Sequence, residues 1–212
     1  SNADIAGLKA THPDKILAVD LTSIAGVWDF NIKDADLWYF SVQKAMGLPA
    51  GLSVMIVSPQ AMEKAKKLGE KQPIGYFNLP AMQAKMAGKY QTLPTPNILN
   101  IYLLGQQLER WNSAGGVARQ QKQSAARADA LYKMFTDHPT AKPFVQNPAH
   151  RSISSVCIEA DEATVKRWHA SAEAANTRLG GGYGPLKPTC IRLATFPGIS
   201  DEEFEKLLGM LK

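Results

Sequence analysis

One lysine and one aspartate each follow a short apolar run in this chain. The run at residues 37–42 leads to Lys44 and a Gly/Pro-rich turn, and an earlier run, ILAV, ends at Asp20. In open α/β sheets, ligands bind outside the carboxyl ends of the strands, where such residues meet. A lysine with a partner carboxylate is the pair that a pyridoxal phosphate enzyme needs, because the amine forms a Schiff base and the carboxylate keeps the pyridinium nitrogen protonated.

Each residue also has an ordinary structural explanation. Lys44 would then be a surface lysine, and Asp20 would be the turn or N-cap aspartate that often follows a strand. The aromatic residues before Lys44 and the MGLPAG turn after it favour the functional interpretation. A lysine in an apolar pocket becomes a nucleophile once it loses its proton.

The elements that must position these residues follow from apolar periodicity and turn signals. In the first part of the chain, strands are predicted at 16–19, 37–42 and 52–57, and helices at 58–68, 81–89, 97–112 and 117–135. The strand at 16–19 is expected to be buried on both faces. The helix at 97–112 carries four apolar residues at helical spacing, namely Ile98, Ile101, Leu104 and Leu108.

A proline-rich segment at 139–148 is the best candidate for a domain boundary. Beyond it the pattern predicts a strand (152–159), a helix (163–175), a strand (189–194) and a helix (201–211). Ser200 and Glu203 have the spacing of a capping box for that last helix. This order predicts a compact α+β module.

Composition excludes several classes of protein. The net charge of +5 is mild and the 24 basic residues are scattered, so no nucleic-acid partner is expected. No apolar run approaches the roughly 20 residues that span a bilayer, so no membrane partner is expected. Cys157 and Cys190 lie in apolar strand-like segments and are predicted to be buried free thiols in a reducing, cytoplasmic compartment. The histidines lack metal-ligand spacing, and residues 1–3 look like a tag remnant.

Three segments carry a resemblance to a known family: FSVQKAMGLPAGLSVMIV, YQTLPTPNILNIYLLG and GYGPLKPTCIRLATFPGISDEEFEKLL. They resemble class V (fold type I) pyridoxal phosphate-dependent aminotransferases, and most of all the phosphoserine aminotransferase branch. The resemblance implies an α/β fold with the C-terminal part of the large cofactor-binding domain at 4–142 and a small α+β domain at 143–212. It also implies a homodimer. The front half of such an enzyme lies outside the match.

The resemblance further implies roles for the residues at the strand ends. Lys44 would be the cofactor lysine and the proton shuttle between the substrate and the cofactor. Asp20 would hold the pyridinium nitrogen of pyridoxal 5'-phosphate, with Thr22 and Ser23 orienting the carboxylate or the ring hydroxyl. Gln43 would help to bind the cofactor phosphate.

Four more residues receive roles in the same way. Ser41 is a weaker cofactor-binding candidate, with strand-edge polarity as its alternative. Thr92 and Thr95 lie in QTLPTPN, a turn that in the family reaches the partner's cofactor phosphate. The branch pattern there is Asn-Thr-Pro-Pro, so both threonines stay open. Arg192 would clamp the substrate's α-carboxylate, for which bidentate guanidinium geometry is suited, or would form a strand-edge salt bridge.

The implied reaction is transamination between L-glutamate and a 2-oxo acid such as 3-phosphohydroxypyruvate, a step of serine biosynthesis. The His-Arg pair that holds the substrate phosphate in better-known relatives is absent, and Lys187 or His150-Arg151 are the available substitutes. A class V desulfurase or lyase is an alternative, but it would need a reactive cysteine in a polar loop. A truncated, inactive fragment is another, because half a sheet exposes an unpaired strand edge.

Overall fold

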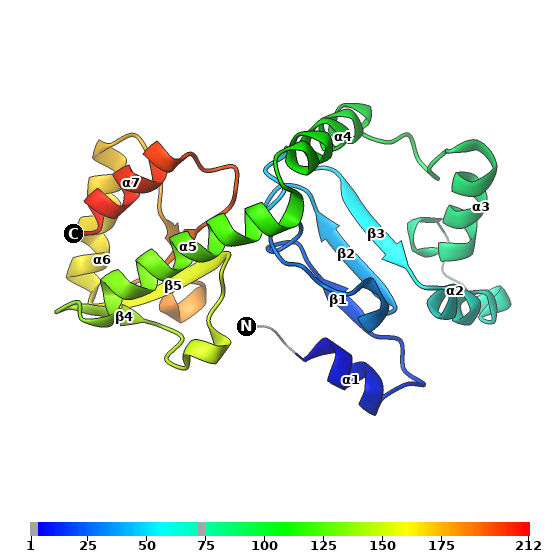
Figure 1. Cartoon of the computed structure of the whole chain (residues 1–212), viewed down its shortest axis with the longest axis horizontal. Coiled ribbons are helices and arrows are strands. Elements are labelled where there is room, and N and C mark those ends of the chain that lie inside the picture. The colour runs from blue at the N-terminus through cyan, green and yellow to red at the C-terminus, as the bar shows by residue number, and fades with distance from the viewer. Residues whose placement is uncertain (1–3, 72–74) are drawn as a thin grey trace.

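The computed structural model describes residues 4–71 and 75–212, so the predicted tag remnant at residues 1–3 lies outside the described residues. Figure 1 shows two groups of elements joined by a long helix. The first group consists of α1 (Ile5–Thr11), β1 (Ala18–Asp20), β2 (Leu37–Ser41), β3 (Ser53–Val57), α2 (Pro59–Lys66), α3 (Leu79–Lys89) and α4 (Ile98–Ser113). The joining helix is α5 (Gly116–Thr136). The second group consists of β4 (Ala141–Pro143), β5 (Ser155–Ala160), α6 (Glu162–Ala174), β6 (Gly180–Gly181), β7 (Cys190–Ala194) and α7 (Asp201–Met210).

The first sheet has the strand order β1-β2-β3. The pair β1 and β2 is parallel, with Asp20 opposite Tyr39, whereas β2 and β3 are antiparallel, with Ser41 opposite Ser53. Because parallel strands end at the same edge of a sheet, the residues that follow β1 and β2 share that edge. This pairing brings Asp20 to the side of the sheet on which the Lys44 turn begins.

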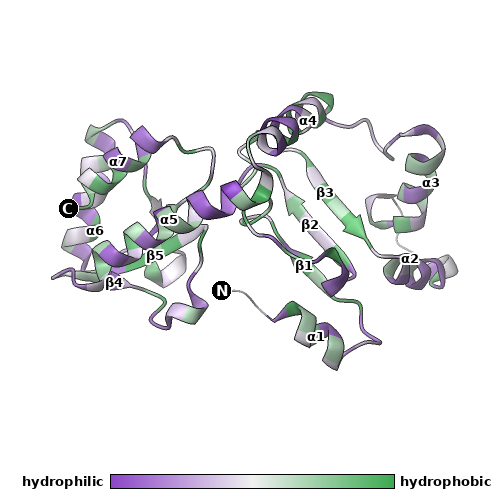
Figure 2. Ribbon diagram, in the orientation of Figure 1, coloured by the Kyte–Doolittle hydropathy of each residue, from purple (hydrophilic) through white to green (hydrophobic). Residues whose placement is uncertain are grey.

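One face of this sheet is packed and the other is open. Trp38 is 1% exposed and belongs to a core cluster with Phe40, whereas the alternating residue Tyr39 is 39% exposed. Figure 2 colours β3 as hydrophobic along most of its length, yet Met55 on that strand is exposed. The predicted burial of the 16–19 strand on both faces is therefore wrong. The strand is Ala18–Asp20 at a sheet edge, and both of its end residues are exposed.

The second sheet has the order β4-β5-β7-β6, and its three strand pairs are all antiparallel. Its core includes Trp168 from α6, Phe204 from α7 and Phe135 from the end of α5. The predicted capping box of α7 is confirmed, since Ser200 and Glu203 bond reciprocally. The predicted fold class is confirmed too: an α/β part precedes an α+β module. The domain boundary at residues 142 and 143 stays a prediction.

Helix α4 exposes most of the apolar residues that give it its helical periodicity. Ile98 is 69% exposed and Leu108 is 42% exposed, whereas Asn100 is 1% exposed and Trp111 is 6% exposed. Trp111 packs on Gly26, where an added Cβ would lie 2.4 Å from the indole ring. The stripe of α4 that faces the first core cluster therefore mixes polar and apolar residues, and most of the periodic apolar residues face outward.

Candidate active site

The Lys44 amine lies at the carboxyl edge of β1 and β2, close to the residues that follow β1. Its Nζ donates a hydrogen bond to Ser23 Oγ at 3.2 Å. The N–H of Thr22 donates to the Asp20 carboxylate at 2.7 Å, and the N–H of Ser41 donates to Thr22 Oγ1 at 3.2 Å. Thr22 thus ties the aspartate to the end of β2, from which the lysine turn departs.

The surroundings of Asp20 favour its ionised form. Its pKa lies below the ordinary value of 3.8, first because the Thr22 side chain hydrogen-bonds to the carboxylate. The Thr22 N–H and the charge of Lys44 lower the pKa further, and together these effects outweigh the opposing effect of burial. Asp20 is therefore a carboxylate at neutral pH, which is the form that pairs with a protonated ring nitrogen.

A cavity of about 470 Å³ brings the two groups of elements together. Lys44 and Ser23 line it from the first group, and Arg192 and Arg178 line it from the second. The rest of the lining comes from β5, β6, β7, α7 and the segments beside them, namely Ser155, Thr177, Leu179, Gly180, Leu193, Ala194, Phe196, Gly198, Ile199, Glu203, Leu207 and Met210. The cavity therefore places a predicted nucleophile and a predicted carboxylate clamp at one site.

Arg192 projects from β7 with part of its guanidinium already fixed. Its Nε donates to the Gly181 carbonyl at 2.8 Å, and its Cζ lies 4.1 Å from the centre of the Tyr183 ring. Across residues 4–71 and 75–212, neither Nη group has a hydrogen-bond partner. Gly180 allows this close pairing, since an added Cβ would lie 2.8 Å from the Arg192 carbonyl oxygen. The two Nη groups are thus oriented and available for a carboxylate.

Six of the predicted site residues do not line this cavity: Asp20 and Thr22, which lie beside it at the end of β1, and Ser41, Gln43, Thr92 and Thr95. Ser41 Oγ pairs with Ser53 Oγ at 3.0 Å, and Gln43 is exposed. Thr92 and Thr95 line a separate cavity of about 320 Å³, and Thr92 Oγ1 donates to the Pro94 carbonyl at 2.5 Å. Within a single chain, the structure does not bring the two threonines to Lys44. The roles of all the predicted site residues, including those of Lys44 and Arg192, stay predictions.

Three residues around the site were missed from the sequence. Asn100 and Gln107 on α4 hydrogen-bond to the turn that follows Lys44. The sequence feature that could have identified them is the spacing of the two amides, which lie seven residues, or about two helical turns, apart and therefore share one face of the helix. Arg178 lines the Lys44 cavity, whereas neither Lys187 nor the His150-Arg151 pair does. Its position directly before the glycine loop was the available signal.

The cysteines lack the features of activated thiols. Cys157 lies on β5 and Cys190 on β7, and burial raises the pKa of both thiols. In the described part of the chain, no three His, Cys, Asp or Glu side chains gather as a metal site would require. No helix within those residues is long and apolar enough to cross a membrane.

The fold and the cavity define a class of protein. A lysine at the carboxyl edge of an α/β sheet, with an arginine from an α+β module in the same cavity, is the arrangement expected of a fold type I pyridoxal phosphate enzyme. Residues 3–179 match the family model described as "Aminotransferase class-V", and the chain belongs to that family. Pyridoxal phosphate is the cofactor that this membership indicates.

Known relatives agree with this assignment. The chain is 31% identical over 202 residues to the phosphoserine aminotransferase of Rhodococcus opacus, which covers 93% of this chain and 54% of the relative. It is 30% identical over 199 residues to the Corynebacterium glutamicum protein of the same name, covering 92% of this chain and 53% of the relative. The chain therefore spans about half the length of the curated relatives that it matches.

Solved structures give the same result. A phosphoserine aminotransferase from Cytophaga hutchinsonii superposes with a TM-score of 0.89 at 31% identity, over 98% of this chain and 57% of that chain. An alanine–glyoxylate aminotransferase from a Nostoc species superposes with a TM-score of 0.84 over 98% of this chain and 54% of that chain. At 19% identity, the second comparison shows the shared fold alone.

Proposed function

We propose that this chain carries the cofactor lysine and the substrate clamp of a pyridoxal phosphate-dependent aminotransferase. The observation that carries the proposal is the single cavity lined by both Lys44 and Arg192. The donor set fits the cofactor, because an amine and an ionised carboxylate follow neighbouring parallel strands at one edge. When bound, pyridoxal phosphate supplies the electron sink for cleavage of the substrate Cα–H bond.

The residues of the chain divide the remaining work. Lys44 holds the cofactor and then moves a proton from the substrate Cα, which requires its amine to reach that atom. The Nη groups of Arg192 hold the α-carboxylate, so that the Cα–H bond faces the amine. Asp20 stays ionised and thereby keeps the ring nitrogen protonated. The hydroxyl of Ser23 fixes the resting position of the amine.

The proposed reaction transfers an amino group between L-glutamate and 3-phosphohydroxypyruvate, as in serine biosynthesis. Two features support this choice: the relatives named phosphoserine aminotransferase, and a second cation, Arg178, in the Lys44 cavity. Arg178 would take the phosphate, in place of the His-Arg pair that this sequence lacks. The identity of the amino donor and that of the amino acceptor are both proposals.

The proposal includes a homodimer. The outward stripe at the start of α4 is apolar, with Ile98, Leu99 and Tyr102 each more than 60% exposed. Thr92 and Thr95 directly precede the start of α4 in the sequence. If a second copy of the chain covered the apolar stripe, the turn that contains these threonines would lie near the cofactor of that second copy. Light scattering tests this, and a monodisperse monomer with bound cofactor would contradict it.

The first experiment is titration of the chain with pyridoxal phosphate, followed by borohydride reduction and peptide mapping. An adduct on Lys44 supports the proposal and justifies an assay with glutamate and candidate 2-oxo acids. Lys44→Ala is the matched control and should lose the adduct at that peptide. A folded chain without an adduct on Lys44 would support the alternative of an inactive fragment.

The alternative of a desulfurase or lyase is not favoured by the cysteines. Such an enzyme needs a thiolate nucleophile in an accessible loop, and a raised pKa reduces the thiolate fraction at neutral pH. Cys157 and Cys190 both belong to strands of the second sheet and both have raised pKa values. An aminotransferase requires neither thiol.

A further inference from the structure

The turn that carries Lys44 contains little regular structure of its own. It connects β2 to β3, and within it the N–H of Gly47 bonds to the Lys44 carbonyl at 2.9 Å. Gly47 and Gly51 have φ values of +69° and +109°, in a region that few residues other than glycine adopt. The turn is also closed by a hydrogen bond from the Leu48 N–H to the Val42 carbonyl at 3.1 Å. The position of the Lys44 amine depends both on these bonds and on the contacts that hold the turn from outside.

Helix α4 supplies those contacts through two amide side chains. Asn100 Nδ2 donates to the Pro49 carbonyl at 2.9 Å and to the Ala50 carbonyl at 3.1 Å. Gln107 Nε2 donates to the Met46 carbonyl at 3.0 Å. Because the two amides lie two helical turns apart, they share one face of α4. Together they hold both halves of the turn by its backbone oxygens.

The environment of Asn100 indicates that its side-chain amide serves as a hydrogen-bond donor rather than as an acceptor. The side chain is 1% exposed, and among residues 4–71 and 75–212 its own Oδ1 has no hydrogen-bond partner. A buried acceptor without a partner costs about 1–3 kcal/mol. Both N–H donors of the amide are directed at the turn.

The helix that presents these amides is itself firmly anchored. Trp111 is 6% exposed and packs on Gly26, just beyond β1. Leu104, between the two amides in sequence, packs against the same core cluster. The stripe of α4 that faces the core thus alternates apolar anchors with amide donors, so α4 can act as a fixed support for the turn.

We infer that Asn100 and Gln107 are positioning residues for Lys44. They fix the backbone of the turn, and thereby set the lysine amine in the cavity that also contains Arg192. This inference rests on the proposed function of Lys44. It adds to that function a support for the turn that comes from α4.

Four variants test the inference. Gln107→Met keeps the length of the side chain and removes the donor, whereas Gln107→Lys restores an N–H donor of similar reach. Asn100→Leu removes two donors at once. Gln106→Met is the matched control, because Gln106 is exposed on the same helix and bonds only to Glu109, at 3.3 Å, among the described residues. Circular dichroism establishes that each variant is folded.

The first measurement is amide hydrogen exchange in the peptide that contains Gly47, without cofactor. We expect Gln107→Met to reduce protection about tenfold, the effect of one net hydrogen bond of typical strength. Gln107→Lys should restore most of the protection, and Gln106→Met should leave it unchanged. If protection is unchanged in folded Gln107→Met and Asn100→Leu, or if Gln107→Lys fails to restore it, the inference is overturned.

The second measurement is the yield of the borohydride-trapped pyridoxal phosphate adduct on Lys44 relative to all other lysines. We expect this selectivity to fall about tenfold in Gln107→Met and to recover in Gln107→Lys. A loss of amide protection with unchanged selectivity would overturn the positioning role while leaving the proposed function intact. Failure of the unmodified chain to trap the cofactor on Lys44 would overturn the proposed function and the positioning role with it.

Discussion

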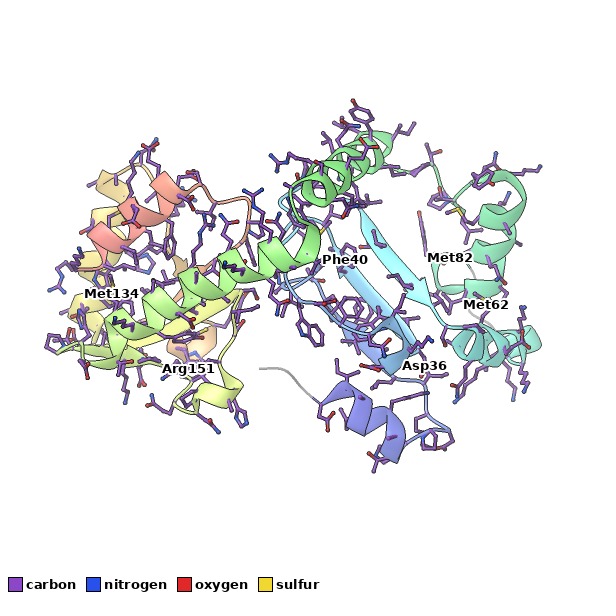
Figure 3. The ribbon with its side chains drawn as sticks, in the orientation of Figure 1. Asp36, Phe40, Met62, Met82, Met134 and Arg151 are labelled. Carbon is purple, nitrogen blue, oxygen red and sulfur yellow. The ribbon has the colours of Figure 1, made fainter. Side chains whose placement is uncertain are left out.

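Asp36 provides the sharpest test of how the first sheet is held together. Its carboxylate accepts hydrogen bonds from Lys9 Nζ at 2.6 Å, from the Leu17 N–H at 2.9 Å and from Ser58 Oγ at 3.1 Å. The residue is 3% exposed and stands just before β2, beside α1 in Figure 3. One carboxylate therefore joins α1, the approach to β1 and the start of α2.

The substitution Asp36→Asn removes the charge and preserves the size of the side chain. Removal of one partner of a buried ion pair costs about 3–5 kcal/mol. Lys9 keeps hydrogen bonds to the Lys15 carbonyl and to Gln60, and its side chain is 19% exposed, so the loss falls at the lower limit. We expect the free energy of unfolding to decrease by about 3 kcal/mol.

The effect should depend on pH in a defined direction. Burial alone would raise the pKa of Asp36, but the hydrogen bonds from Lys9, the Leu17 N–H and Ser58 bring it below the ordinary value of 3.8. The stabilisation is therefore complete above the unfolded-state pKa and is lost as the pH falls through the lower folded-state pKa. The two proteins should differ most at neutral pH and converge in acid.

Urea unfolding followed by tryptophan fluorescence measures this difference, because three of the four tryptophans pack in or against the first core cluster. Asp34→Asn is the matched control, since Asp34 is only half-buried, and it should change the free energy of unfolding by less than about 0.5 kcal/mol. A similarly small change for Asp36→Asn, or a difference that does not vary with pH, would refute the reasoning.

Four further predictions concern other sites. Gly26→Ala should destabilise the chain by about 2–4 kcal/mol in urea unfolding, because Gly26 has a φ of +77° and the new methyl would meet the indole at 2.4 Å. Gly105→Ala on α4 meets nothing within 4 Å and should instead stabilise by about 0.5–1 kcal/mol. Cys157 and Cys190 should react with Ellman's reagent more slowly at neutral pH than a free thiol does, since burial raises both pKa values; rates equal to that of free cysteine would contradict this. If the chain is active, Arg192→Lys should raise KM about 10–100-fold in steady-state assays by removing the planar fork, and an unchanged KM would exclude Arg192 as the clamp.

Much of the local structure could be predicted because it depends on neighbours in the sequence. The helix starts at Ser58 and Ser200 each have a hydroxyl that accepts from a backbone N–H three residues ahead. The strand-to-turn change before Lys44 is equally local, since alternating apolar residues give way to glycine and proline. Membership of the family could be predicted for the same reason, because the motif around Lys44 is contiguous.

The burial pattern could not be predicted, because it depends on what covers each face. The outward stripe of α4 was apolar and the inward stripe contained Asn100 and Gln107, since the core side must satisfy the carbonyls of a neighbouring turn. Periodicity identified the helix, but of its four periodic apolar residues only Leu104 packs against the core cluster. Arg178 was missed because it lies in the segment between α6 and β6, and only the tertiary structure brings that segment to the Lys44 cavity.

The sequence by itself determined the family, the elements and the identity of the candidate nucleophile. These are encoded in short stretches whose chemistry depends on residue type and spacing. Only the tertiary structure decided that Lys44 and Arg192 line the same cavity, and that two amides of α4 hold the lysine turn. Such contacts join residues distant in sequence, and their free energy depends on packing and on hydrogen-bond geometry that no local pattern contains.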